Sequence, residues 1–148
     1  MADLEISFVQ IHSDLPEPKY AHEGDAGADL VSAEAAVLKP GQRLAVATGL
    51  HVAIPIGYVG LIHPRSGLAL KNGISMVNTP GTIDAGYRGE IKVILINHDR
   101  EVDFKIERGD RIAQLVIQKV ERASFIRVVS LEDSQRGEGG FGSTGVTS

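Results

Sequence analysis

Short β-rich runs separated by turn-forming residues recur along most of this chain. Turn clusters such as Lys39 to Gln42, Asn97 to Arg100 and Arg108 to Asp110 divide them. Regular short strands with turn chemistry between them are typical of an all-β sandwich or barrel, which is the fold class that we expect. The predicted strands are Ile6 to Ile11, Ala28 to Ser32, Arg43 to Thr48, His51 to Ile54, Tyr58 to Ile62, Gly73 to Val77, Glu90 to Asn97, Val102 to Ile106, Arg111 to Val120 and Phe125 to Val129.

One segment departs from this β pattern. Residues 66 to 73 have the composition of a short helix, for which we predict Ser66 as the N-cap and Gly73 as the stop signal. Two helical turns are marginally stable alone, so this helix should depend on its surroundings.

Two apolar stretches need interpretation. Leu44 to Ile62 contains no Asp, Glu, Lys or Arg and approaches the roughly 20 residues of a membrane span. Because Pro55 and several glycines interrupt it, we predict two or three core strands there and no membrane association. Ile91 to Ile96 is nearly continuous in apolar residues, which predicts burial on both faces, inside one chain or between copies.

Composition limits the possible functions. The chain has 148 residues, which fits one domain, and a net charge of −4, so no overall positive field would attract nucleic acid. It contains no cysteine, which excludes disulfides, thiolate catalysis and cysteine-ligated zinc. The start, Met1 to Glu5, is acidic and unlike a secretory signal, and we expect a cytoplasmic protein.

The composition changes after Glu132. Glycine, serine and threonine dominate the remaining residues, which offer little apolar surface to bury. We therefore predict a β domain over residues 1–132 and a mobile C-terminal tail over residues 133–148. Consecutive backbone N–H groups, hydroxyls and a guanidinium in such a tail are suited to wrap a polyphosphate.

The segment from Asn78 to Lys92 carries the densest chemistry. Three glycines and a proline bend the backbone around Asp84, Tyr87 and Asn78, and a strand-like run follows directly. Glycine lets a main chain approach a ligand closely because it has no Cβ. We predict a binding site there, although Asp84 alone could equally be a turn carboxylate and Asn78 a turn former.

Five motifs in order resemble the trimeric dUTP diphosphatases (dUTPases). This resemblance implies a jelly-roll-like β-barrel or sandwich, a homotrimer with shared active sites and dependence on Mg²⁺. It also implies hydrolysis of dUTP to dUMP and pyrophosphate by attack of water on the α-phosphate. The motifs are Ala26 to Glu34, His63 to Ala69, Asn78 to Lys92, Arg108 to Leu115 and Arg136 to Gly145.

The resemblance assigns roles around the predicted turn. Asp84 would be the general base, and Asn78 would bind the edge of the uracil ring. Tyr87 would lie against the deoxyribose and leave no room for a 2′-hydroxyl. The backbone at Thr82 and Ile83 would complete recognition of the base, and Lys92 would contact the nucleotide as well.

The phosphates and the metal are assigned to other segments. Arg65, Ser66, Gly67 and Gln114 would bind phosphate, and Asp29 would hold a hydrated Mg²⁺ ion indirectly, through water. From the local sequence alone, Ser66 is equally a simple helix cap and Asp29 a solvated loop carboxylate.

The tail completes the implied site. Phe141 would stack on the uracil ring and Arg136 would pair with the terminal phosphate, while Gly142, Ser143 and Thr144 would bind the phosphates. Two alternatives remain open: a dCTP deaminase-like enzyme of the same fold, and a regulatory protein that binds nucleotide without turnover.

Overall fold

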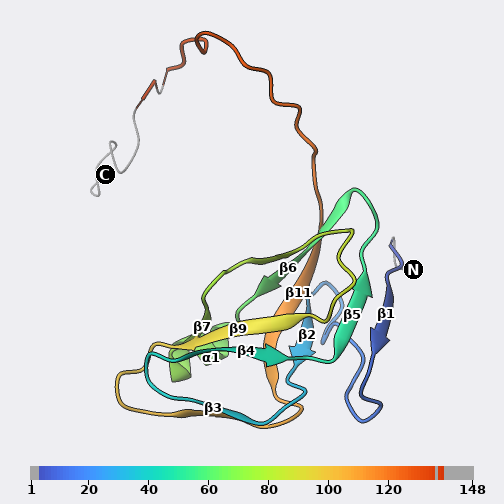
Figure 1. The fold of residues 1–148 in the computed structure, drawn as a ribbon, viewed down its shortest axis with the longest axis vertical. Helices are drawn as coiled ribbons and strands as arrows, with labels where there is room; N and C mark the ends of the chain where they lie inside the picture. Colours follow the sequence, from blue (N-terminus) through green and yellow to red (C-terminus); the bar gives the residue numbers. More distant parts are fainter. Residues whose placement is uncertain (1–3, 136, 139–148) are drawn as a thin grey trace.

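A computed structural model describes residues 4–135 and 137–138. Its elements are short antiparallel strands and one helix (Figure 1), as the turn spacing predicts. In chain order they are β1 (Ser7–Gln10), β2 (Gly27–Val31), β3 (Ala36–Leu38), β4 (Arg43–Ala47), β5 (Leu50–Ala53), β6 (Tyr58–His63), α1 (Ser66–Asn72), β7 (Ile74–Met76), β8 (Gly81–Ile83), β9 (Lys92–Asn97), β10 (Phe104–Ile106) and β11 (Arg111–Lys119).

The strands form four antiparallel sheets. The largest has the order β2-β11-β6-β8, a second has the order β4-β9-β7, and β1-β5 and β10-β3 are two-stranded. The predicted all-β class is confirmed, whereas the described residues form no closed barrel. One hydrophobic cluster joins the sheets, because each of them contributes buried residues such as Leu30, Leu38, Val52 and Val93.

The buried strands show the period of two that packing on one face requires. In β9, Val93, Leu95 and Asn97 are buried, while Ile94 and Ile96 between them are only half-buried. The prediction of burial on both faces is therefore not met within one chain. Asn97 is tolerated in the core because its amide donates to two backbone carbonyls.

The N-cap of helix α1 lies one residue earlier than predicted. Arg65 is the N-cap, in an extended conformation without a side-chain capping bond, and Ser66 is the first helical residue, so Ser66 as N-cap was wrong. Gly73 ends the helix as predicted: it is left-handed at φ 64°, and its N–H donates to the carbonyl of Ala69.

The strand prediction needs correction at three places. The strands β3 and β8, three residues each, were missed, because such short pieces carry almost no periodic signal. The predicted strand Phe125 to Val129 is absent: those residues are exposed and have no regular secondary structure. A strand needs a neighbouring strand for its hydrogen bonds, and this segment lies away from the body of the molecule (Figure 1).

The apolar stretch from Leu44 to Ile62 folds into β4, β5 and β6, which confirms the prediction of core strands. No helix in the described part of the chain has the length and apolar character needed to cross a membrane. Most of the tail, residues 136 and 139–148, lies outside the described residues, so the division at residue 132 stays a prediction.

Candidate active site

A pocket of about 690 Å³ opens between β8, β9 and the turn that joins them. We call it the Asp84 pocket. It brings together five of the predicted site residues, although they come from different parts of the segment. Its lining consists of Ala45, Thr82, Ile83, Asp84, Tyr87, Glu90, Lys92 and Ile94.

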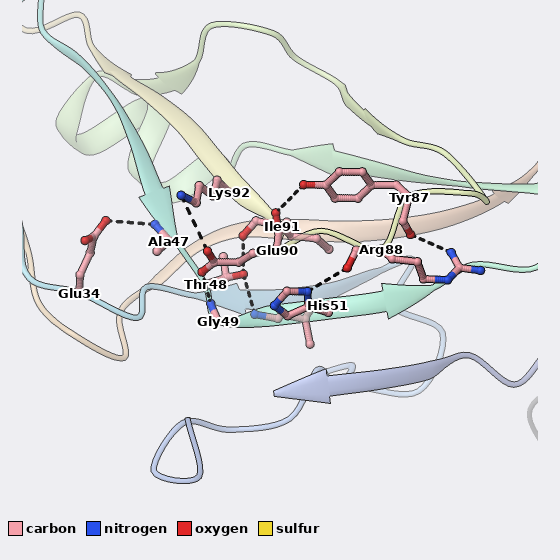
Figure 2. A network of polar contacts seen from close by, with 11 residues as sticks. Glu34, Ala47, Thr48, Gly49, His51, Tyr87, Arg88, Glu90, Ile91 and Lys92 are labelled. Atoms are coloured by element: carbon pink, nitrogen blue, oxygen red, sulfur yellow. Dashed lines mark hydrogen bonds and ion pairs between the residues drawn. The ribbon is translucent and has the colours of Figure 1, made fainter. Parts of the chain in front are cut away.

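The turn after β8 presents the carboxylate and the phenol. The N–H of Tyr87 donates to the carbonyl of Asp84 at 3.0 Å, which closes a tight turn. Asp84 is exposed at the end of β8, so solvent can reach it. The hydroxyl of Tyr87 donates to the carbonyl of Glu90 at 2.9 Å, and this bond fixes the direction of the ring (Figure 2).

Gly89 gives the Tyr87 ring its space. A Cβ atom at position 89 would lie 2.6 Å from Cζ of Tyr87 and 2.9 Å from Cε2. Real carbon atoms do not approach so closely, so any side chain there would displace the ring. At Gly86, on the other side of the tyrosine, an added Cβ would meet nothing within 4 Å.

A second pocket, of about 290 Å³, lies at the start of α1. We call it the Arg65 pocket. It brings together four of the residues predicted to bind phosphate, Arg65, Ser66, Gly67 and Gln114, and adds the ammonium group of Lys71. Its two cationic side chains favour an anionic ligand.

Asp29 of β2 lies between two arginines. Its Oδ1 is 3.3 Å from Nε of Arg65, and its Oδ2 accepts a hydrogen bond from Arg111 at 3.3 Å. Oδ1 is buried and has no hydrogen bond of good geometry, so its contact with Arg65 is an attraction between charges. The carboxylate side chain is 15% exposed.

The described residues contain no group of three or more histidine or acidic side chains that could cage a metal ion. Asp29 is already paired with two guanidinium groups, so it suits a contact through water better than direct ligation. A hydrated Mg²⁺ ion, which keeps several waters and binds substrate phosphates, fits this donor set.

The two pockets share no lining residue in one chain. Asn78 lines neither of them; it is exposed next to Gly81, where its amide nitrogen would be 3.4 Å from an added Cβ. The remaining predicted residues, Arg136, Phe141, Gly142, Ser143 and Thr144, lie outside the described residues.

Two charged residues of these pockets were not predicted. Glu90 lines the Asp84 pocket, accepts the N–H of Gly49 at 2.9 Å and lies 3.9 Å from the ammonium of Lys92. The spacing of Glu90 and Lys92, two residues apart next to a strand, is the signal that places both on one face. Lys71 had a weaker signal, a cation in the last turn of the helix.

Comparison with known proteins decides the family. The model of the dUTPase family matches residues 13–145. The chain belongs to the dUTPase family. It is 63% identical over 136 residues to the deoxyuridine 5′-triphosphate nucleotidohydrolase of Thermobifida fusca, covering 92% of this chain and 76% of that protein. The protein of the same name from Corynebacterium glutamicum is 59% identical over 148 residues, covering 99% of both.

Solved structures agree with this assignment. A mutant dUTPase of Staphylococcus bacteriophage 80alpha, solved with dUpNHpp, superposes with a TM-score of 0.88 at 32% identity and covers 96% of this chain and 99% of that one. A mutant dUTPase of phage phi11 of S. aureus has a TM-score of 0.81 at 28% identity, covering 88% of this chain and 100% of that one. Its description names a structural Mg(II) ion.

Proposed function

We propose that this protein hydrolyses dUTP to dUMP and pyrophosphate, which limits uracil in DNA and supplies dUMP. The observation that carries the proposal is the Asp84 pocket. There a dUTPase-family chain brings an exposed carboxylate, a fixed phenol and a cation to one opening. Family relatives that carry the name of this activity are 63% identical to the chain over 136 aligned residues and 59% identical over 148.

Asp84 acts as the general base. Its exposed position lets a water molecule approach, and removal of a proton from that water prepares it to attack the α-phosphorus in line. The proton passes to the carboxylate, and pyrophosphate leaves with the bonding electrons. Such phosphoryl chemistry depends on positioning and electrostatics and requires no covalent intermediate.

Selectivity for deoxyuridine comes from the same turn. The ring of Tyr87, held by its bond to the carbonyl of Glu90, lies against the deoxyribose and excludes a 2′-hydroxyl. The amide of Asn78 carries both a donor and an acceptor for the edge of the uracil ring, and the backbone at Thr82 and Ile83 completes this recognition.

The triphosphate binds the Arg65 pocket. Arg65, Ser66, Gly67 and Gln114 supply a guanidinium, a hydroxyl, backbone N–H groups and an amide to the phosphate oxygens. Asp29 keeps the guanidinium groups of Arg65 and Arg111 in place before the substrate arrives.

Asp29 is the residue that would hold a hydrated Mg²⁺ ion, and it would do so through water, because this one carboxylate is already paired with two arginines. Such an ion would neutralise phosphate charge. The tail residues Arg136, Phe141, Gly142, Ser143 and Thr144 close over the nucleotide and exclude bulk water.

The active sites are shared between copies of a homotrimer. Two features support this proposal: the two pockets share no lining residue within one chain, and the described residues leave an apolar segment after β11 uncovered. That segment consists of Phe125, Ile126, Val128, Val129 and Leu131, each more than half exposed.

Complementation tests the sharing. Copies carrying Asp84→Asn and copies carrying Arg65→Ala should each be inactive alone. After the two are unfolded and refolded together, mixed trimers should regain part of the activity, since some sites then combine two intact halves. Absence of any recovery, with mixed trimers demonstrated by native mass spectrometry, would count against shared sites.

Asp84→Asn tests the reaction itself. The variant should lose hydrolysis of dUTP, measured by release of pyrophosphate, while isothermal titration still detects binding of the nucleotide. Parallel assays with dTTP, UTP and dCTP, with and without Mg²⁺, define the substrate. Ammonia released from dCTP would instead support the deaminase alternative, and tight binding of dUTP without turnover by the unaltered protein would support the regulatory alternative.

A further inference from the structure

The turn that carries Asp84 and Tyr87 is braced by a side chain of its own. One terminal nitrogen of Arg88 donates to the carbonyl of Ala85 at 2.6 Å and to the carbonyl of Tyr87 at 2.7 Å. The guanidinium therefore folds back over the turn and connects these two carbonyls; Figure 2 shows its contact with the carbonyl of Tyr87. Charged donors make stronger hydrogen bonds than neutral ones.

The brace is in turn tied to strand β5. Nδ1 of His51 lies 3.0 Å from the carbonyl of Arg88, and because a carbonyl only accepts, this nitrogen carries the proton. The same neighbourhood holds the end of the turn at two further points. Glu90 accepts the N–H of Gly49, and the N–H of Ile91 donates to the carbonyl of Leu50 at 2.8 Å.

Neither Arg88 nor His51 lines the Asp84 pocket. Both line a separate apolar hollow of about 410 Å³ beside β1 and β5. This hollow shares no lining residue with the Asp84 pocket. They can therefore influence a nucleotide in the Asp84 pocket only through the turn.

We propose that Arg88 and His51 are positioning residues, which hold Asp84 and Tyr87 at the distance and angle that attack and sugar selection require. The inference rests on the proposed function. The cross-braced turn has one defined geometry. Without the guanidinium, the described contacts that hold residues 85 to 89 are the Asp84–Tyr87 backbone bond, the Tyr87 hydroxyl bond and the contact of His51 with the carbonyl of Arg88. A displacement of about 1 Å at a reacting group is enough to lower turnover about 100-fold.

Four variants test the proposal. Arg88→Met keeps the alkyl stem and removes the donors, and His51→Phe keeps a ring and removes Nδ1. His51→Asn is the matched rescue, because the amide nitrogen of asparagine reaches about as far as Nδ1 and also donates. Arg100→Met, at an exposed position in the loop after β9, controls for loss of an arginine.

Activity is the first readout. Arg88→Met should lower kcat for dUTP by about 10-fold to 100-fold, with a smaller change in KM. It should also reduce the preference for dUTP over UTP, because the turn no longer holds the ring of Tyr87 in place. His51→Phe should show the same pattern more weakly, while His51→Asn and Arg100→Met should keep the kcat and the preference of the unaltered protein.

Hydrogen exchange of the nucleotide-free protein is the second readout. In Arg88→Met, amides of residues 84–90 should exchange at least about 10-fold faster, with strand β11 unchanged. This measurement requires no enzymatic activity, so it tests the brace independently of hydrolysis. Inactivity of the unaltered protein on dUTP would refute only the proposed function. Unaltered kcat and nucleotide preference in Arg88→Met, or unaltered exchange of the turn, would overturn the inference.

Discussion

Replacing Gly89 with alanine should impair catalysis and nucleotide selectivity while leaving stability almost unchanged. A Cβ atom at position 89 would lie 2.6 Å from Cζ of Tyr87, whereas carbon atoms prefer about 3.5 Å or more. The ring must therefore retreat by about 1 Å, and its bond to the carbonyl of Glu90 is stretched or lost. No steric conflict arises from the backbone itself, because Gly89 is not in the left-handed region.

The expected change in stability is small because two effects oppose each other. Loss of the tyrosine hydrogen bond costs about 1 kcal/mol, while replacing glycine by alanine stabilises by about 0.4 to 1 kcal/mol through the unfolded chain. The Tm should therefore move by no more than about 3 °C. Catalysis should suffer much more, with kcat/KM for dUTP lowered up to about 100-fold and UTP discriminated less strongly.

The assay compares pyrophosphate release from dUTP and UTP in Gly89→Ala, Gly86→Ala and a double-mutant cycle with Tyr87→Ala. Gly86→Ala is the matched control, since a Cβ there has open space. If the effect acts through the ring, adding Gly89→Ala to Tyr87→Ala should cost nothing further. An equal loss in both backgrounds, or an unchanged dUTP/UTP ratio in the single variant, would refute this reasoning.

Three further predictions follow from the fold. Asn97→Ala should lower the free energy of unfolding by about 3 kcal/mol in urea titrations at fixed protein concentration, because buried backbone groups lose their partners; a loss below about 1 kcal/mol would contradict this. Truncation after Glu132 should abolish most dUTP hydrolysis yet keep the β-type circular dichroism spectrum, since the core cluster ends at Leu115. The side-chain hydrogen bond from Arg108 lowers the pKa of Asp14 below its usual 3.8. The stability that this pair adds is thus complete above pH 3.8 and is lost as the pH falls through the lowered pKa. Asp14→Asn should reduce the Tm slightly at pH 7, and a difference from the unaltered protein that does not shrink as the pH falls below 3.8 would be the contrary result.

Periodicity and turn chemistry predicted most of the strands, but not the pieces that depend on their neighbours. Strand β9 was recognisable because its apolar residues define it without help from other segments. Strand β8 was not, because its three residues pair with β6 through contacts distant in sequence. The error at Phe125 to Val129 has the same origin: the pattern is strand-like, but none of the strands in the described part of the chain pairs with it.

The candidate site shows the same limit. Thr82, Asp84 and Tyr87, which one motif contains, line the same pocket, since they lie close together in sequence. The contacts of Asp29 with Arg65 and Arg111 join residues 36 and 82 positions apart, and spacing alone does not predict such contacts. The brace by Arg88 was missed for another reason: an arginine in a glycine-rich turn has the composition of an ordinary solvated residue.

The uncovered apolar segment after β11 affects how copies of this protein assemble. Under the proposed trimer, every newly made copy exposes Phe125, Val129 and Leu131 until it meets other copies. Exposed strips of this kind also adhere to the wrong neighbours, so correct assembly competes with precipitation. The yield of active protein refolded from denaturant should therefore peak at an intermediate protein concentration. Dilute copies stay monomeric, whereas concentrated copies aggregate.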